Sequence, residues 1–540
     1  MNTKRNQFYY AGLFTVFLLV HSAFADLGFF ESRWVPRPAP VYSTAVTKNQ
    51  PSRSADITFT ANFSVKTAKV LPTHFGNNTN GYISDIYESS FAIENLRQAN
   101  ISILRLPGGN WSNKWFWDGV TPDDIVSGAW VDGHQSLAFK EDENSWIVST
   151  DSMYALAKKI GAEIQPCVNF SYARYNTDPH PVARAASYAA SWVRDVKQKG
   201  ISAPYWEVGN ENYGSWQMGY EVNGDTITGT EYGQGFNVFS DSMKAANPTI
   251  KIGAVIVEDD EGYGSYNNWT RGVLPEVQDK ADFLSLHDYF TWDSDMNSIS
   301  PQEVLSSIEL IQKNKEDVEA MVAKYTDHPG DHFPIAFTEY NMRAGYKNIS
   351  HVSNLFITMC IHELIRNEYG LVNLWGISNG YNTYEANSGD HGMLARKDPI
   401  LETGHPNPSF YSYYFSTRFI GDHFVKTSPL QQNGVYLWAS RFSGGEGGIT
   451  IVNTTGKAQL TEVVLQNLYN NGEFEYFQIY ADSLLDEIIT INGVSGTKRS
   501  GPRNYQDIPP FKSAFKRGKL KFLAKPYSTN FLLIKGKKRS

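Results

Sequence analysis

The chain has little cysteine and no excess of positive charge. Among 540 residues only Cys167 and Cys360 are cysteines, which excludes a scaffold built on several disulfides. One lies in a predicted strand and the other in a predicted helix, so we expect two buried free thiols. Lys and Arg (48) are outnumbered by Asp and Glu (56), and the formal net charge is −8. This balance argues against nucleic acid or a membrane surface as partner.

The motifs of three other enzyme classes are also missing from the sequence. There is no G-x-S-x-G of a serine hydrolase, and no G-x-G-x-x-G follows a strand, so no nucleotide cofactor is implied. The pair His362-Glu363 begins like the zinc motif H-E-x-x-H, but Arg366 stands where the second His is required. We therefore predict neither a metal site nor a cofactor.

A long apolar run occurs only at the N-terminus. Lys4 and Arg5 precede the apolar stretch Ala11–Val20, and Ala23-Phe24-Ala25 fits a small-x-small cleavage site, which indicates a signal peptide over residues 1–25. The alternative, a membrane anchor, is disfavoured because the run is too short to span about 30 Å of hydrocarbon. We expect a secreted protein, extracellular or periplasmic, that carries a net charge of −10 once the two basic residues are removed.

Short apolar runs alternate with helical patterns from residue 71 to 419, which is the signature of repeated βα units. Pro181–Lys199 and Glu231–Ala246 are the clearest helices, since apolar residues recur in them at helical spacing. Eight strands are predicted, which makes a (β/α)8 TIM barrel: Leu71–Gly76, Ser102–Leu106, Glu163–Val168, Tyr205–Val208, Lys251–Val257, Phe283–Leu286, Ile335–Thr338 and Val372–Gly376.

Residues 420–540 show a different pattern, typical of an all-β domain. Strand-like segments separated by Gly, Asn and Ser predict a C-terminal β-sandwich: Val435–Phe442, Gly448–Asn453, Leu460–Leu465, Phe474–Ala481 and Lys521–Ile534. The leader, residues 26–70, ends in the alternating stretch Ile57–Val70, which we expect to be a strand outside the barrel that joins the β domain. The fold class is therefore α/β, a TIM barrel over 71–419 followed by a β-sandwich.

Two predicted barrel strands end in carboxylates. Tyr205–Val208 leads into Gly209-Asn210-Glu211, and Ile335–Thr338 leads into Glu339. These are the fourth and seventh strands, and the carboxyl ends of barrel strands form the active site. Glutamates at these positions can face each other across a sugar at about 5 to 5.5 Å, the separation of a retaining glycoside hydrolase.

These motifs resemble those of the retaining clan A glycoside hydrolases. Within the clan, Leu104–Asn110, the Trp-Phe-Trp-Asp-Gly run at 115–119 and Gly209-Asn210-Glu211 are most similar to the α-L-arabinofuranosidases. The resemblance implies one role for each matching residue: Glu211 as acid/base, Glu339 as nucleophile, Asn210 as partner of a sugar hydroxyl, Arg105 beside the nucleophile, Tyr289 of His287-Asp288-Tyr289 holding Glu339, and Asn110 contacting the glycone.

Charge and aromatic residues complete the predicted site. Arg105 and Tyr289 should favour an ionised Glu339, and that charge should raise the pKa of Glu211 and keep it protonated. Trp117, in the long loop after the second strand, and Trp375, near the end of the eighth, could stack on sugar faces, although core packing is an equal alternative for each ring.

Three functions remain open at this point. The first is an arabinofuranosidase-like hydrolase of plant or algal cell-wall polysaccharide or oligosaccharide. The second is an endo-acting β-glycanase on cell-wall or marine galactan, glucan or xylan, because the long aromatic loop after the second strand could build an extended cleft. The first strand ends in Gly76-Asn77-Asn78 where the arabinofuranosidases have a glycone-binding acid, and this departure weakens the choice of glycone. The third is a non-catalytic carbohydrate-binding protein. The sugar, the linkage and the oligomeric state are not predicted.

Overall fold

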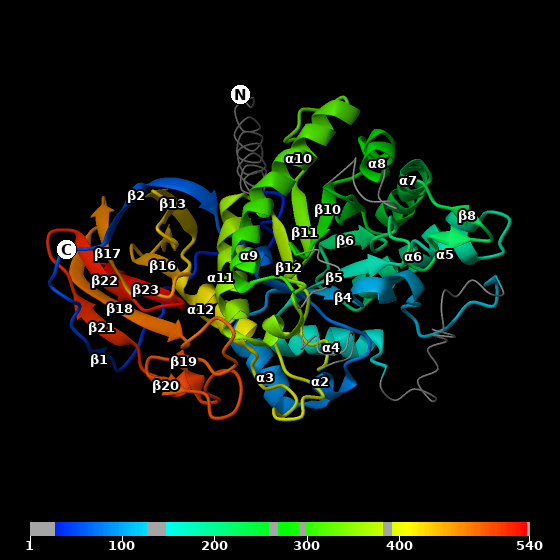
Figure 1. The fold of residues 1–540 in the computed structure, drawn as a ribbon. Coiled ribbons are helices and arrows are strands. Elements are labelled where there is room, and N and C mark those ends of the chain that lie inside the picture. The colour runs from blue at the N-terminus through cyan, green and yellow to red at the C-terminus, as the bar shows by residue number, and fades with distance from the viewer. Residues whose placement is uncertain (1–27, 127–146, 259–267, 292–297, 382–390, 537–540) are drawn as a thin grey trace, which may run out of the picture.

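The computed structural model describes residues 28–126, 147–258, 268–291, 298–381 and 391–536. The predicted signal segment, residues 1–25, lies outside them. A barrel of strands surrounded by helices lies beside a sheet domain (Figure 1). Within the described residues, no helix is long and apolar enough to cross a membrane.

The barrel closes through parallel strands, and the predicted TIM barrel is confirmed. In the described part of the chain it has eight strands, with the last paired to the first through Leu374 and Asn77. The strands, in barrel order, are β3 (Gly76–Asn78), β4 (Ile103–Leu106), β5 (Glu163–Val168), β6 (Tyr205–Val208), β9 (Lys251–Val255), β10 (Phe283–Asp288), β11 (Ile335–Tyr340) and β12 (Leu371–Leu374).

The first barrel strand differs from the prediction of Leu71–Gly76. Residues Pro72–Phe75 form a 3₁₀ turn, and the strand begins only at Gly76. Pro72 suits a first helical position because it has no N–H to leave unpaired. The turn is then held at β12, where Thr73 Oγ1 and His74 Nε2 bond the carbonyls of Gly370 and Tyr369.

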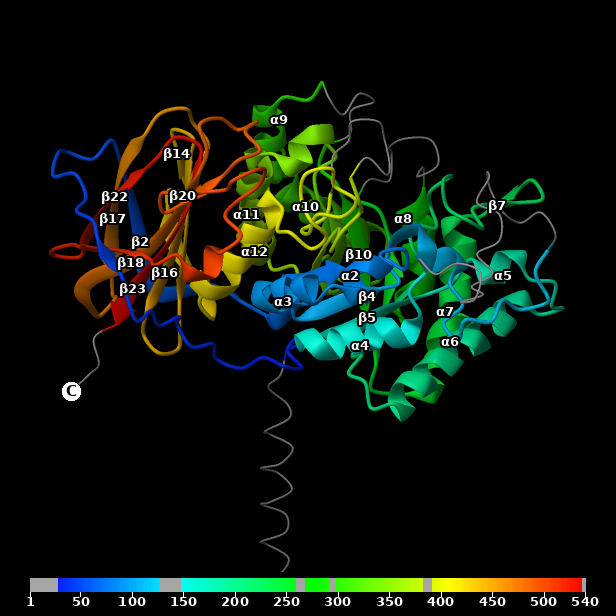
Figure 2. The ribbon, with the colours of Figure 1, turned by 90° about the horizontal axis from the view of Figure 1, so that it is seen from below.

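The helices lie outside the strands, as α4 beside β5 in Figure 2. The predicted helices Pro181–Lys199 and Glu231–Ala246 are confirmed as α6 and α7, and α7 begins with a capping box between Thr228 and Glu231. The helices are α2 (Ser84–Glu88), α3 (Ser90–Ala99), α4 (Thr150–Ile160), α5 (Tyr172–Tyr175), α6 (Pro181–Gln198), α7 (Gly229–Ala246), α8 (Trp269–Val277), α9 (Pro301–Ser306), α10 (Leu310–Tyr325), α11 (His351–Arg366) and α12 (Pro408–Phe419).

An apolar layer closes the bottom of the barrel, at the amino ends of the strands. It is built by four side chains from alternate strands, Ile103, Tyr205, Phe283 and Leu371. Phe30, from the leader, is buried against them, with its ring centroid 4.9 Å from that of Tyr205 and 5.6 Å from that of Phe283. The interior above this layer is therefore sealed from the bottom.

The C-terminal part is sheet-rich, as predicted. Its described strands form a 13-stranded sheet whose main path runs β1-β21-β18-β23-β16-β15-β13-β2-β17-β22. Strands from both ends of this path share one apolar core, so the sheet folds over on itself. The strands are β1 (Val46–Thr47), β2 (Ile57–Lys69), β13 (His423–Ser428), β14 (Gln431–Gln432), β15 (Val435–Arg441), β16 (Gly447–Asn453), β17 (Gln459–Gln466), β18 (Asn470–Tyr480), β19 (Thr490–Ile491), β20 (Val494–Ser495), β21 (Phe511–Ala514), β22 (Lys519–Ala524) and β23 (Ser528–Gly536). A small hairpin, β7 (Glu221–Val222) with β8 (Asp225–Thr226), lies apart from it.

Of two strands predicted for this domain, one is present as expected and the other is divided in two. The strand expected over Ile57–Val70 is β2, and Figure 1 shows it in blue among the orange and red C-terminal strands. The segment Lys521–Ile534 is two strands, not one, because the chain turns between β22 and β23 at Tyr527, whose φ is +44°.

The barrel and the sheet meet along α11 and α12. Trp438 of β15 donates from Nε1 to Glu363 Oε1 at 2.8 Å, and the Phe415 and Phe531 rings stack at 5.4 Å. Cys360, also on α11, and Cys167, on β5, are buried free thiols, which confirms that prediction.

Candidate active site

The end of β6 turns sharply to present Glu211. Gly209 has φ +81° and Glu211 itself has φ +44°, a left-handed conformation that a non-glycine residue rarely adopts. A Cβ on Gly209 would lie 1.9 Å from Asn212 Oδ1, so only glycine fits there. The turn therefore lifts Glu211 to the top of the barrel interior.

The end of β11 carries a β-bulge. Against β10, Phe337 pairs with Leu286 but Glu339 pairs with His287, so Thr338 is the extra residue. In a regular strand, neighbouring side chains point to opposite faces. The bulge allows both Thr338 and Glu339 to turn into the barrel, as bulges beside active sites commonly do.

Glu339 is buried and held at both oxygens. Arg105 Nη1 donates to Oε1 at 2.7 Å, and the Tyr289 hydroxyl donates to Oε2 at 3.0 Å. His287 Nδ1 lies 3.8 Å from the same Oε2. The site fixes the orientation of this carboxylate, as a nucleophile needs.

Glu211 is also held at both oxygens, by a different set of groups. Its Oε1 is 3.0 Å from His287 Nδ1, while Trp216 Nε1 and Gln217 Nε2 each donate to Oε2 at 2.9 Å. The Glu211 side chain is 12% exposed, compared with 4% for Glu339. Glu211 is therefore the more exposed of the two carboxylates.

The two carboxylates lie close together. One ligand atom from each of Glu211, His287 and Glu339 can be chosen so that all three lie within 4.8 Å of one another. A retaining pair needs about 5 to 5.5 Å between carboxyl groups, and an inverting pair about 6.5 to 9.5 Å. The separation here fits a retaining pair.

Arg105 is the centre of the polar layer below. Besides Glu339, its guanidinium binds Glu207 Oε2 from Nε at 2.5 Å, Asn78 Oδ1 from Nη1 at 3.0 Å and Asn210 Oδ1 from Nη2 at 2.9 Å. Every one of these partners is buried. The planar guanidinium, with its five donors, suits a site that joins so many acceptors.

The pKa values of the two glutamates shift in the opposite directions to those expected. Burial raises the pKa of Glu339, and repulsion from Glu211 adds to this, although His287 and Arg105 oppose it. Burial alone would raise the pKa of Glu211. The hydrogen bond and the charge of His287 outweigh this effect, so the net shift of the Glu211 pKa is downward. The pKa of His287 rises, because the two carboxylates outweigh its burial. The expectation omitted His287, whose Nδ1 lies 3.0 Å from Glu211 Oε1.

The other predicted residues divide into two groups. Asn110 reaches Glu211 through Gln217, whose Nε2 donates to Asn110 Oδ1 at 2.7 Å. The ring of Trp375 lies against Gly109, where a Cβ would come within 2.4 Å of it. Trp117 is not brought to the carboxylates, because its Nε1 bonds Ser191 of α6 at 3.2 Å and its ring packs on that helix.

Asn210 keeps one group available for a ligand. Its Oδ1 is bound by Arg105, while its buried Nδ2 has no hydrogen-bond partner among the described residues. A buried amide without a partner costs stability, so it commonly marks a ligand site. This fits the predicted partner of a sugar hydroxyl.

Sequence reasoning missed Glu207, Thr338, Trp216 and Gln217. Glu207 sits in the middle of an apolar strand, and a charge buried there is a signal that could have been used, since such a charge needs a partner. Trp216 and Gln217 follow Glu211 closely, in a turn whose path the sequence does not reveal. Thr338 depends on the bulge.

A metal is not favoured at this site. Glu211, His287 and Glu339 are, in the described part of the chain, the group of side chains close enough to hold one. However, the Arg105 cation already lies against Glu339 at 2.7 Å, and a second cation beside it would be repelled.

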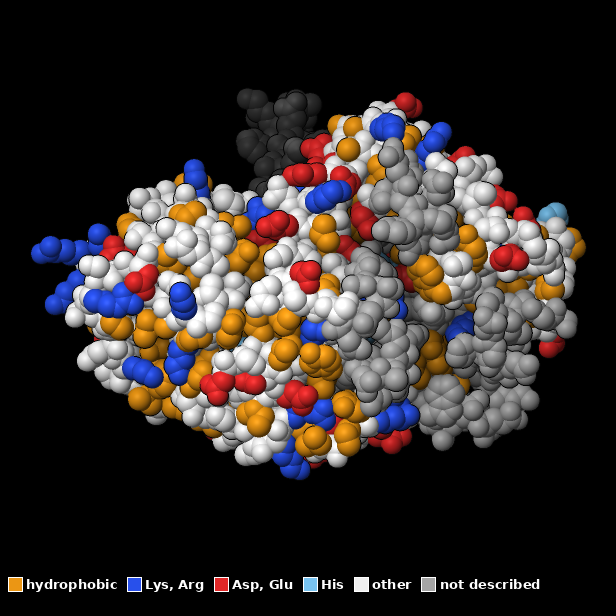
Figure 3. All heavy atoms as spheres, viewed as in Figure 1, with side chains coloured by type: hydrophobic (Ala, Val, Ile, Leu, Met, Phe, Trp, Pro, Cys, Tyr) orange, Lys and Arg blue, Asp and Glu red, His pale blue; other side chains and the backbone are white. Residues whose placement is uncertain are grey.

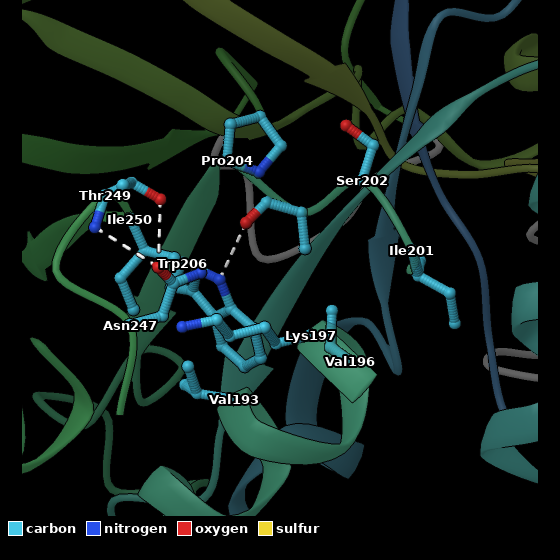
Figure 4. A pocket seen from close by; sticks show the side chains of 11 residues that line it. Val193, Val196, Lys197, Ile201, Ser202, Pro204, Trp206, Asn247, Thr249 and Ile250 are labelled. Atoms are coloured by element: carbon cyan, nitrogen blue, oxygen red, sulfur yellow. Dashed lines mark hydrogen bonds between the residues drawn. The ribbon is translucent and has the colours of Figure 1, made fainter. Parts of the chain in front are cut away.

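A pocket at the other end of the barrel is remote from this chemistry. Figure 4 shows its lining around Trp206, between the end of α6 and the residues that precede β6 and β9. These are the amino ends of the strands, whereas Glu211 follows the carboxyl end of β6. On the molecular face in Figure 3, acidic and basic side chains are interspersed.

Comparison with known proteins tests the resemblance. No protein-family model matches the chain. An intracellular exo-α-(1→5)-L-arabinofuranosidase of Acetivibrio thermocellus is 28% identical over 204 residues, 37% of this chain and 38% of that protein. A probable α-L-arabinofuranosidase C of Aspergillus clavatus is 26% identical over 197 residues, 35% of each chain. The predicted resemblance is confirmed, over little more than a third of these relatives' length.

Solved structures match over a longer range. The α-L-arabinofuranosidase of Thermotoga maritima, in complex with arabinose, has a TM-score of 0.63 at 18% identity and covers 88% of this chain and 99% of its own. The family 51 enzyme of Thermotoga petrophila has a TM-score of 0.64 at 19% identity, with the same coverage. The fold is that of the α-L-arabinofuranosidases. A bifunctional glucanase-xylanase from a metagenome library shares it, with a TM-score of 0.61 at 13% identity over 90% of this chain and 100% of its own.

Proposed function

We propose that the chain is a retaining glycoside hydrolase, arabinofuranosidase-like, that acts by double displacement with Glu339 as nucleophile and Glu211 as acid/base. The observation that carries this is the pair of carboxylates at the ends of β6 and β11, with atoms within 4.8 Å of each other. The arrangement of Arg105 and Tyr289 around Glu339 supports it, since a non-catalytic binding protein needs neither.

In the first step Glu339 attacks the anomeric carbon while Glu211 protonates the departing oxygen. Glu211 gives up its own carboxyl proton, which before the step lies in the hydrogen bond between Glu211 Oε1 and His287 Nδ1. Arg105 and Tyr289 hold the attacking carboxylate in place, and the amide Nδ2 of Asn210 is placed to donate to a sugar hydroxyl. The glycosyl group is then esterified to Glu339.

In the second step water displaces Glu339 from the anomeric carbon. Glu211, now a carboxylate, takes a proton from that water. Its pKa falls at this stage because Glu339, neutral in the ester, no longer repels the Glu211 carboxylate. Two inversions give net retention of configuration.

Replacement of Glu339 tests the assignment. Glu339→Ala should abolish hydrolysis of aryl glycosides, and azide should restore turnover with a glycosyl azide of inverted configuration as product. Glu316→Ala, on the exposed side of α10, is a control that should behave as the wild type. Full activity in Glu339→Ala would refute the role.

The substrate is proposed with an alternative. Similarity to arabinofuranosidases favours an arabinofuranosyl glycone from plant or algal cell-wall polysaccharide. An endo-β-glycanase is favoured instead by the end of β3, where Asn78 is committed to Arg105 and to the carbonyls of Thr338 and Leu374, so that no acid is offered to a glycone. Assays on aryl arabinofuranosides and on soluble xylan, glucan and galactan would separate the two. Release of arabinose would support the first, and shortening of the polysaccharide chains would support the second.

We also propose that the protein is secreted. The N-terminal 25 residues have the charge, the apolar run and the cleavage site of a signal peptide. This differs from relatives whose names call them intracellular. Expression in a secreting host should release a protein that begins near Asp26 by N-terminal sequencing, and retention of the uncleaved chain inside the cells would contradict it.

A further inference from the structure

Glu207 is a third buried carboxylate in the site, and the double displacement gives it no part. Its side chain is 0% exposed. Its Oε2 accepts from Arg105 Nε at 2.5 Å, and through Arg105 it supports the nucleophile. Its Oε1 accepts from Thr338 Oγ1 at 2.9 Å, and through Thr338 it reaches His287 and the acid/base.

The hydrogen count along this chain of contacts determines where His287 carries its proton. Glu207, ion-paired with Arg105, can only accept hydrogen bonds, so Thr338 must give its single hydroxyl proton to Glu207. The same hydroxyl oxygen lies 2.9 Å from His287 Nε2 and can then only accept. Nε2 must therefore be the nitrogen that donates.

We propose that Glu207 and Thr338 are positioning residues that fix the proton of His287 on Nε2 and so leave Nδ1 to share the acid proton of Glu211. The inference rests on the proposed function. In the neutral ring Nδ1 has only a lone pair, so Glu211 must carry the proton of the 3.0 Å hydrogen bond between them. With the opposite tautomer, Nδ1–H would stabilise an ionised Glu211, which cannot act as an acid.

The charged groups around His287 come from four strands. Glu207 and Glu211 face it from β6 and the following turn, at 3.8 Å and 3.0 Å, and Glu339 faces it from β11 at 3.8 Å. Arg105, on β4, opposes protonation of the ring. On its own strand, Asp288 is bound by Asn314 Nδ2 at 2.8 Å.

The tautomer can be measured directly by ¹⁵N NMR of the histidine-labelled protein. The sequence holds 12 histidines, and the His287 signals are those lost in His287→Asn. At a pH where the ring is neutral, we expect Nε2–H in the wild type. Thr338→Val, which removes the hydroxyl and keeps the shape, should admit Nδ1–H, whereas Thr338→Ser should preserve Nε2–H. Nδ1–H in the wild type would overturn the proposal.

Kinetics give a second test that a merely structural role would not pass. A dinitrophenyl glycoside needs no acid to release its leaving group, whereas an alkyl glycoside does. Thr338→Val should lower kcat/KM at least about 10-fold on the alkyl glycoside, with little change on the dinitrophenyl glycoside. Its alkaline limb should move to lower pH, because Nδ1–H lowers the pKa of Glu211.

Matched variants separate the contact of Glu207 with Thr338 from its contact with Arg105. Thr338→Ser should restore the alkyl glycoside rate, while Glu207→Gln, which also disturbs Arg105, should slow both substrates. Equal losses on both substrates in Thr338→Val, with an unchanged pH profile, would refute the positioning role. If the wild type hydrolyses no glycoside at all, the proposed function fails, and the NMR measurement still decides the tautomer.

Discussion

Removal of Arg105 should destabilise the protein strongly, and in a manner that depends on pH. Arg105 is fully buried between two carboxylates, Glu207 and Glu339, whose side chains are 0% and 4% exposed. Arg105→Met keeps an unbranched apolar stem but leaves both carboxylates without their cation. Breaking one buried ion pair costs about 3–5 kcal/mol, which corresponds to a melting temperature lower by about 6–10 °C at roughly 2 °C per kcal/mol.

The pH dependence of this loss follows from the same charges. Burial already raises the pKa of Glu339 in the folded state, and loss of the Arg105 cation, which opposes this shift, raises it further. Such a group favours folding below the unfolded pKa and opposes it as the pH rises through the folded pKa. The deficit of Arg105→Met should therefore be large at pH 7 and shrink towards pH 4.

Thermal unfolding of the wild type and the variant at both pH values checks this. Arg97→Met is the matched control, because Arg97 and Glu94 form an ion pair whose side chains are 55% and 42% exposed. Exposed pairs contribute about 0–1 kcal/mol, so its melting temperature should hardly change. A deficit of Arg105→Met that is independent of pH would show that packing, and not charge, accounts for the loss.

Three further predictions concern the core, the loop and the pH profile. Phe30→Ala should cost about 3–5 kcal/mol by thermal unfolding with kcat unchanged, whereas Val35→Ala, at an exposed site, should cost little. Gly109→Ala should raise KM with the fold intact by circular dichroism, because φ is +57° and the new Cβ would strike Trp375. The kcat/KM profile should be bell-shaped, since the nucleophile must be ionised and the acid protonated. Its acid limb should lie above pH 4.5, the ordinary value for a glutamate, because burial raises the pKa of the nucleophile.

The architecture of the barrel follows from local sequence. Each buried strand is a short apolar run, and the carboxylates that end two of them were visible as charges at positions where the pattern stops. The error at the first strand has a local cause, since Pro72 starts a 3₁₀ turn that is fixed only by contacts with β12, far along the chain. Long-range contacts of this kind leave no trace in a local pattern.

The finer structure of the site depends on features that sequence does not carry. Alternation along β11 places Thr338 and Glu339 on opposite faces, and only the bulge brings both inside. The sequence allowed the ring of Trp117 either to line the site or to pack in the core. It packs on α6, where its Nε1 donates to Ser191. The expected pKa directions were wrong because burial outweighs Arg105 and Tyr289 at Glu339, and because the effect of His287 on Glu211 was left out.

The burial of Phe30 at the barrel bottom has a consequence for the order of folding. Its partners include Leu371, near the end of the barrel sequence, so the bottom cannot be completed until the last strand exists. Arg37, a little further along the leader, bonds Asp422 across 385 residues. Contacts of such high sequence separation form late and slowly. The floor of the barrel can therefore close only after the segment around Leu371 has been synthesised, some 340 residues after Phe30.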